Sequence, residues 1–103
     1  MPLVHLAWPY GCKHLAMVAG SWSKWHPQVL VPLRKQAQDG SLIEVWSTEI
    51  RLPDNVTQTF RFKFIVDGDW LYDSALPHVP NHHGSFDNII EVHYYFGNNS
   101  TYY

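Results

Sequence analysis

Two tryptophans are the residues best placed, by type and context, to recognise a ligand. Trp25 lies in a polar stretch, residues 21–27, where a large apolar ring has no evident packing role. Trp70 follows Asp67-Gly68, a dipeptide typical of tight hairpin turns. The flat face of an indole can stack on the C–H face of a sugar, while polar neighbours bind the hydroxyls. The pattern therefore favours a carbohydrate platform, and a partly buried packing role for either ring is the alternative.

Other reactive side chains give weaker signals. Cys12 and His14 are close in sequence but lack the partner pattern of a nucleophile and its base. A zinc site is disfavoured in the histidine-rich segment, because its last two histidines are adjacent and would point to opposite sides of an extended chain; the residues are His78, His82 and His83. A glycosidase pair is disfavoured against turn and surface roles for Asp67, Asp69 and Asp73. We expect no catalytic residue, no metal and no cofactor.

The clearest strand predicted to position these residues covers 57–66. Its even-numbered positions from Phe60 to Val66 are apolar, whereas the alternating positions include Arg61 and Lys63. A period of two predicts that the phenylalanine row is core and that Lys63 points outward. Asp67-Gly68 then predicts a type I′ turn, which needs positive φ at both central residues. Trp70 opens the returning strand.

The rest of the chain reads as short β-rich runs separated by Gly, Pro, Asn and Asp, which is typical of an all-β sandwich or barrel. Further strands are predicted over residues 4–8, 15–19, 29–33, 42–52 and 88–92. Residues 74–85 are predicted to be irregular and residues 97–103 a frayed tail. We expect a single domain over 1–103 with its core between about residues 4 and 93. Strand context assigns three tryptophans to that core, namely Trp8, Trp22 and Trp46.

Composition narrows the class of partner. Seven Lys and Arg stand against nine Asp and Glu in 103 residues, a net charge of −2. No basic stripe is present, so neither nucleic acid nor an anionic membrane surface is expected as a partner. No apolar run approaches the roughly 20 residues that span a bilayer. Cys12 is the only cysteine, which precludes an internal disulfide and favours a cytoplasmic or nuclear setting. An uncharged ligand suits this chain best.

Three stretches carry a family resemblance that covers roughly residues 4–93. They are Val18-Ala-Gly-Ser-Trp-Ser-Lys-Trp25, Phe62-Lys-Phe-Ile-Val-Asp-Gly-Asp-Trp70 and Gly84-Ser-Phe-Asp-Asn-Ile-Ile-Glu-Val92. In this order they resemble the glycogen-binding domain of AMP-activated protein kinase beta subunits, a family-48 carbohydrate-binding module. The resemblance implies an immunoglobulin-like antiparallel β-sandwich that binds α-1,4-linked glucan without catalysis. It also implies a module of a larger protein, which targets or regulates an attached or partner protein.

The resemblance assigns roles by position. Trp25 and Trp70 match the two stacking tryptophans, and Lys63 matches a lysine that hydrogen-bonds sugar hydroxyls. The family's final loop reads Leu-Gly-Thr-x-Asn-Asn, and here His83, Ser85 and Asp87 replace its leucine, threonine and first asparagine. A carboxylate accepts hydrogen bonds but cannot donate them. The expected partners are α-glucan chains and, through regions beyond this module, kinase or phosphatase subunits. The alternative is a protein–protein interaction or scaffold domain of the same fold that has lost sugar binding.

Overall fold

The computed structural model describes residues 3–53, 57–95 and 99–102, and these residues form antiparallel strands with a single 3-10 turn. The elements are β1 (Leu3–Trp8), β2 (Ala16–Gly20), η1 (Ser21–Ser23), β3 (Gln28–Val29), β4 (Val31–Gln36), β5 (Leu42–Arg51), β6 (Gln58–Val66), β7 (Asp69–Leu71), β8 (His78–Pro80), β9 (Phe86–Tyr95) and β10 (Asn99–Tyr102). The prediction of an all-β antiparallel sandwich is confirmed. No helix in the described ranges is long and apolar enough to cross a membrane.

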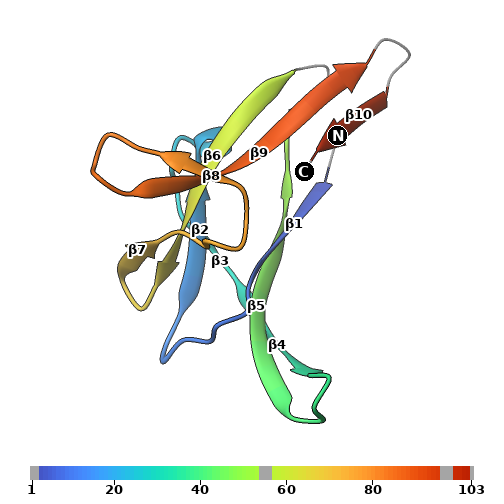
Figure 1. Ribbon diagram of the computed structural model, residues 1–103, viewed down its shortest axis with the longest axis vertical. Coiled ribbons are helices and arrows are strands. Elements are labelled where there is room, and N and C mark those ends of the chain that lie inside the picture. Colours follow the sequence, from blue (N-terminus) through green and yellow to red (C-terminus); the bar gives the residue numbers. More distant parts are fainter. Residues whose placement is uncertain (1–2, 54–56, 96–98, 103) are drawn as a thin grey trace.

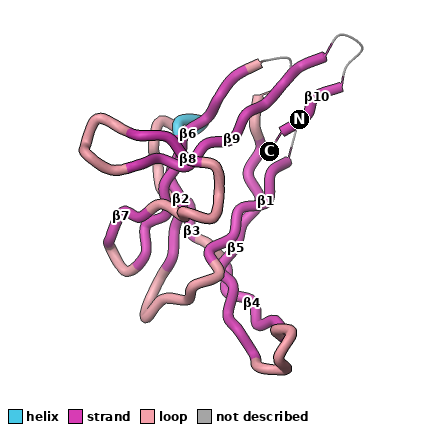
Figure 2. The backbone as a smooth tube through the Cα atoms, viewed as in Figure 1, coloured by secondary structure: helices cyan, strands magenta, loops and turns pink. Residues whose placement is uncertain are grey.

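Two sheets make up the sandwich. The smaller sheet has the strand order β1-β5-β4, and the larger has the order β10-β9-β6-β2-β3, with β7 paired to β6 and β8 paired to β9. Figure 1 shows β1 and β5 crossing beside the larger sheet, while the β4–β5 hairpin extends beyond it at the bottom of the view. The tube in Figure 2 shows the strands joined by loops, several of them long, with one short helical turn. β6 is central, because β2, β7 and β9 all pair with it.

The core lies between the two sheets and is built around the phenylalanine row of β6. Phe60, Phe62 and Phe64 are all buried, as the alternation predicted, and they join a cluster with the inward residues of β1. Burying one such side chain contributes about 1.5–3 kcal/mol to stability. Trp8 is buried in this cluster, and Trp22 and Trp46 pack against it half-buried. The core therefore fixes which face of β6 remains for a ligand.

The opposite face of β6 is covered more than the sequence indicated. Lys63 does lie on the side away from the phenylalanine row, but its side chain does not project into solvent, since the residue is only 9% exposed. The prediction of an outward-pointing Lys63 was therefore wrong in this respect. The cause is long-range: the ammonium bonds to the Phe86 carbonyl and lies near the Ser85 hydroxyl and the Tyr72 ring, all of them later in the chain. The alternation of apolar and polar residues predicts which face of a strand a side chain is on. It does not predict whether segments later in the chain cover that face.

Two other segments differ from the sequence-based expectation. Residues 74–85 contain a short strand, β8, which pairs with the start of β9. The proposed frayed tail contains β10, whose residues Asn99–Tyr102 pair with β9, while residues 97, 98 and 103 lie outside the described part. Both strands are short and owe their pairing to β9, which extends over ten residues rather than the five predicted.

Candidate functional site

The loop after β2 presents Trp25. Gly20 ends β2, and a Cβ at this position would overlap ring atoms of Trp22, so only glycine lets that indole fold back toward Phe62. After η1 the chain turns sharply, because Lys24 and Trp25 both have positive φ, 54° and 64°. The Trp25 amide donates to the Gly20 carbonyl at 2.9 Å and closes the turn. The turn holds the Trp25 ring at the surface, where it is 36% exposed.

The turn between β6 and β7 presents Trp70. Asp67 and Gly68 have φ of 51° and 87°, which confirms the predicted type I′ turn. The Asp67 carboxylate also accepts hydrogen bonds from three backbone amides, those of residues 13, 14 and 15, at 2.8, 2.7 and 3.1 Å. These bonds hold the pKa of the Asp67 carboxyl below its usual value. The hairpin that carries Trp70 is thereby tied to the chain entering β2.

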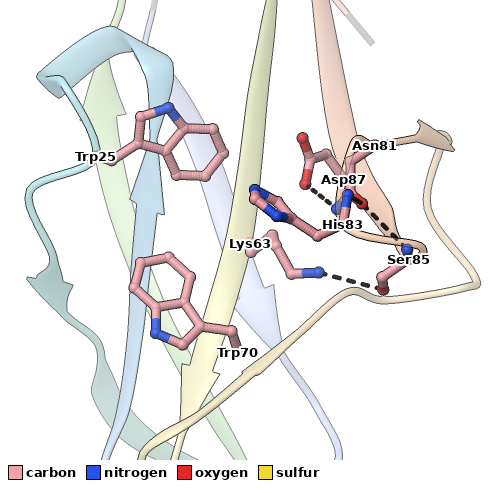
Figure 3. Close-up of a pocket in the computed structure, with 7 residues that line it drawn as sticks. All are labelled: Trp25, Lys63, Trp70, Asn81, His83, Ser85 and Asp87. Atoms are coloured by element: carbon pink, nitrogen blue, oxygen red, sulfur yellow. Dashed lines mark hydrogen bonds between the residues drawn. The ribbon is translucent and has the colours of Figure 1, made fainter.

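The two indoles lie side by side although 45 residues separate them in sequence. Their ring centroids are 6.4 Å apart and their planes are inclined by 49°. Trp70 is 49% exposed. Both rings line a pocket of about 500 Å³. Figure 3 shows them on the same wall of it. Two exposed apolar faces inclined in this way fit successive flat groups of a ligand that bends.

Lys63 lies at the floor of the pocket between the indoles and the opposite loop (Figure 3). Its ammonium donates to the Phe86 carbonyl at 2.9 Å and lies 3.4 Å from the Ser85 hydroxyl. The same nitrogen is 5.9 Å from the centroid of the Tyr72 ring. A lysine ammonium has three donors, so one remains for a ligand hydroxyl in the pocket.

The loop between β8 and β9 forms the other wall. The predicted residues His83, Ser85 and Asp87 all line the pocket, so the six sequence-derived candidates lie around one space. Asn81 lines it too and was missed. Its side-chain oxygen accepts hydrogen bonds from the amides of residues 83 and 85, at 2.9 and 3.1 Å. An asparagine three residues before a glycine is a common turn signal, but it does not indicate that the side chain also faces a pocket.

Asp87, like Lys63, is buried although it lines the pocket. Its carboxylate accepts a hydrogen bond from the Asn81 side-chain amide at 3.0 Å and lies 3.4 Å from the Arg61 guanidinium. Arg61 comes from β6, two residues before Lys63. One carboxylate thus joins the central strand to the pocket loop.

The weaker chemical candidates are placed elsewhere. No group of three or more His, Cys, Asp or Glu residues in the described ranges is arranged to hold a metal ion. The Asp73 carboxylate accepts hydrogen bonds from the Tyr10 hydroxyl and the Ala75 amide, at 2.7 and 2.9 Å. This contact raises the pKa of Tyr10, because the hydroxyl hydrogen is held by a carboxylate. Burial raises the pKa of the Cys12 thiol, which disfavours the thiolate that a nucleophile needs.

A match to a known family extends over the fold and this pocket together. The model of the family described as the glycogen recognition site of AMP-activated protein kinase matches residues 2–96. The chain belongs to this family. The resemblance drawn from the three sequence stretches is thereby confirmed, and the glycogen-recognition family supports carbohydrate binding as the general function of the chain.

The chain is also similar in sequence to curated beta subunits of protein kinases. The chain is 33% identical over 88 residues to SNF1-related protein kinase regulatory subunit beta-1 of Arabidopsis thaliana, a match that covers 85% of this chain and 27% of the relative. It is 31% identical over 87 residues to 5'-AMP-activated protein kinase subunit beta-2 of Mus musculus, covering 84% and 28%. The chain therefore spans little more than a quarter of the length of these relatives.

Proposed function

We propose that this chain binds α-1,4-linked glucan, such as a glycogen or starch-like chain, without catalysing any reaction on it. Two successive sugar rings stack on Trp25 and Trp70, and hydroxyls along the chain are bound by Lys63 and the loop opposite. The observation that carries the proposal is the pair of exposed indoles, 6.4 Å apart and inclined by 49°. A sugar stacks best when its C–H face is parallel to the ring, so the inclination favours a curved α-linked chain over an extended β-linked one.

The polar wall supplies hydrogen bonds at the sugar edges. The Ser85 hydroxyl lies beside the Lys63 ammonium and can accept from it while donating its own hydrogen to a sugar. The His83 ring extends toward the indoles in Figure 3 and offers one donor and one acceptor where the family has an apolar leucine. Asp87 is buried, so its carboxylate acts as an acceptor only at the pocket edge. These contacts orient the glucan, while the indoles supply most of the affinity.

The module serves, in this proposal, to bring an attached or partner protein to glucan. Curated relatives are subunits of protein kinases, and this chain spans only part of their length. A kinase assembly is therefore the partner we favour, with a phosphatase as the predicted alternative. A cytoplasmic or nuclear location stays a prediction from the single cysteine.

Titration with maltoheptaose tests the proposal, with tryptophan fluorescence as the readout. Two stacking rings on an open pocket predict a dissociation constant between micromolar and millimolar. β-Cyclodextrin, a closed curved α-1,4-glucan, should bind at least as well, and a cello-oligosaccharide of equal length should bind much more weakly. A fluorescence signal that stays constant up to several millimolar maltoheptaose would rule out glucan binding by this pocket.

Removing either stacking ring should abolish most of the binding while the protein remains folded. We expect Trp25→Ala and Trp70→Ala each to raise the dissociation constant at least about tenfold, because each loses one of two stacking faces. Calorimetry measures this without relying on the altered fluorophores. Tyr10→Ala is the matched control, since Tyr10 is an exposed aromatic residue outside the pocket lining. Normal affinity in either tryptophan variant would show that the rings are wrongly assigned.

The second candidate function is an interaction domain of the same fold without sugar binding. Exposed apolar side chains on the β4–β5 hairpin favour it, with Val31 58% and Leu42 70% exposed. A patch of this kind is typical of a protein-binding surface. If this protein binds a kinase subunit but calorimetry detects no binding of maltoheptaose or β-cyclodextrin, the result would support the interaction domain in place of glucan binding.

A further inference from the structure

The turn at residues 81–85 is held internally by one side chain. The side-chain oxygen of Asn81 accepts hydrogen bonds from the backbone amides of His83 and Ser85. The backbone amide of Asn81 donates to the Ser85 carbonyl at 3.0 Å. These bonds fix the backbone on both sides of Gly84, whose φ is 75°. The turn therefore has its shape before any ligand is present, and His83 and Ser85 face the pocket as a consequence.

The same side chain connects the turn to the sheet. The Asn81 amide nitrogen donates to Asp87 at 3.0 Å, and the other Asp87 oxygen faces the Arg61 guanidinium at 3.4 Å. The guanidinium also lies 3.4 Å from the Pro80 carbonyl, so Arg61 contacts both strands that flank the turn. A buried carboxylate requires such partners, because its charge has lost most of its water. Arg61 is part of β6, next to the position of Lys63 on the same face.

Arg61 also reaches the other wall of the pocket through its backbone. Its amide donates to the Ser21 hydroxyl at 3.0 Å, and Ser21 begins the turn that carries Trp25. One residue of β6 is thus hydrogen-bonded to the segments on both sides of the ligand space. A change at this point would alter the distance between the stacking rings and the hydrogen-bonding loop.

We propose that Arg61, Asp87 and Asn81 form a positioning network that sets the 81–85 turn for glucan, with Asn81 as its central member. This inference rests on the proposed function for its ligand, and it assigns Asp87 chiefly to the loop rather than to the sugar. A loop that is ordered in advance loses less conformational freedom when the sugar arrives. Asn81 and Arg61 then act on affinity without stacking on the sugar themselves.

An exchange of the two side chains tests the network. Asn81→Ala removes both ends of the connection, and we expect the maltoheptaose dissociation constant to rise about tenfold, equivalent to about one hydrogen bond. Asn81→Asp keeps the acceptor for the two amides but sets two carboxylates against each other, so its affinity should be similarly reduced. The double variant N81D/D87N restores a donor facing an acceptor, still leaves an acceptor for Arg61, and should recover affinity to within about threefold of the original.

Amide hydrogen exchange measures the same claim without sugar. The amides of residues 83 and 85 should be protected in the original protein, exchange faster in Asn81→Ala, and regain protection in the double variant. His82→Ala, an exposed residue of the same turn outside the pocket lining, is the control and should change neither readout. Original affinity or unchanged protection in Asn81→Ala, or a double variant no better than Asn81→Asp, would overturn the network. If the original protein binds no glucan at all, the proposed function fails, and the exchange rates still decide the positioning claim.

Discussion

Lys24 and Trp25 hold left-handed backbone conformations although neither is glycine. An ordinary residue in this region costs roughly 1–2 kcal/mol relative to its right-handed form. The surrounding hydrogen bonds, above all that from the Trp25 amide to the Gly20 carbonyl, hold the strained turn in place. Strain maintained at an exposed aromatic residue is typical of a functional position. Trp25 is thus placed by its backbone, and its ring contributes little to the core.

This strain predicts opposite effects of glycine at the two stacking positions. Trp25→Gly should be more stable than Trp25→Ala by about 0.5–1 kcal/mol, because glycine adopts positive φ without penalty. Trp70→Gly should be less stable than Trp70→Ala by a similar amount, about 0.5–1 kcal/mol, because Trp70 lies in β7 with ordinary strand geometry. Urea unfolding of the four variants measures both differences. Equal signs at the two positions would contradict the role assigned to the Trp25 backbone.

The end of β2 shows how one element positions another. Gly20 leaves room for the Trp22 ring, which packs against Phe62, and the same residue's carbonyl receives the Trp25 amide. A methyl group at position 20 must push the Trp22 ring away. Gly20 therefore affects both the packing of Trp22 in the core and the position of Trp25 in the pocket.

Gly20→Ala should consequently lower both stability and glucan affinity. We expect a loss of about 1–3 kcal/mol in the free energy of unfolding, as is usual for overpacking. In the double variant G20A/W22A the clash partner is absent, so the two changes should cost less together than their sum. Denaturant unfolding of the four members of this cycle gives the coupling energy. Strict additivity would mean that Trp22 is not what requires glycine here.

Sequence patterns predicted some elements well because the relevant forces are local. The alternation from Phe60 to Val66 and the Asp67-Gly68 turn each depend on neighbouring residues, and both were confirmed. The burial of Lys63 depends on Phe86, more than 20 residues away, and no periodicity encodes it. Asn81 was missed for the same reason, since its bond to Asp87 exists only once β8 and β9 pair.

Another long-range contact that escaped prediction is made by Asn88. Its side chain is fully buried, accepts from the Asp73 amide at 2.7 Å and donates to the Asp73 and Pro77 carbonyls at 2.8 and 3.2 Å. It fastens the irregular segment after β7 to β9. The sequence marked Asn88 as part of a family motif, but its structural role emerges only from the folded chain.

Acid stability of the whole molecule should depend on Asp67, which joins the Trp70 hairpin to the chain before β2. Its folded-state pKa is lowered because three backbone amides donate to the ionised carboxylate. The stabilisation is therefore complete above the unfolded pKa of about 3.9 and is lost as the pH falls through the lower folded value. We expect the free energy of unfolding to fall as the pH drops below about 4, and to fall less in Asp67→Asn.

A second carboxylate provides the control for this measurement. The Ser41 hydroxyl and amide lower the pKa of Asp39 in the β4–β5 turn, far in sequence from either tryptophan. Asp39→Asn should also reduce the pH dependence of the free energy of unfolding, but it should leave glucan affinity unchanged. Asp67→Asn should weaken glucan affinity by loosening the Trp70 hairpin. An unaltered acid transition in Asp67→Asn would show that this carboxylate does not hold the hairpin.

β6 serves the interior and the ligand face with the same run of residues. Its phenylalanines enter the core, the intervening Arg61 and Lys63 anchor the pocket, and its end leads directly to Trp70. Because successive side chains of a strand point to opposite faces, one inserted residue would send every one of these groups to the wrong side. If the chain binds glucan as proposed, substitutions at loop tips such as His83 can change which glucan is preferred, whereas the length of β6 must stay constant.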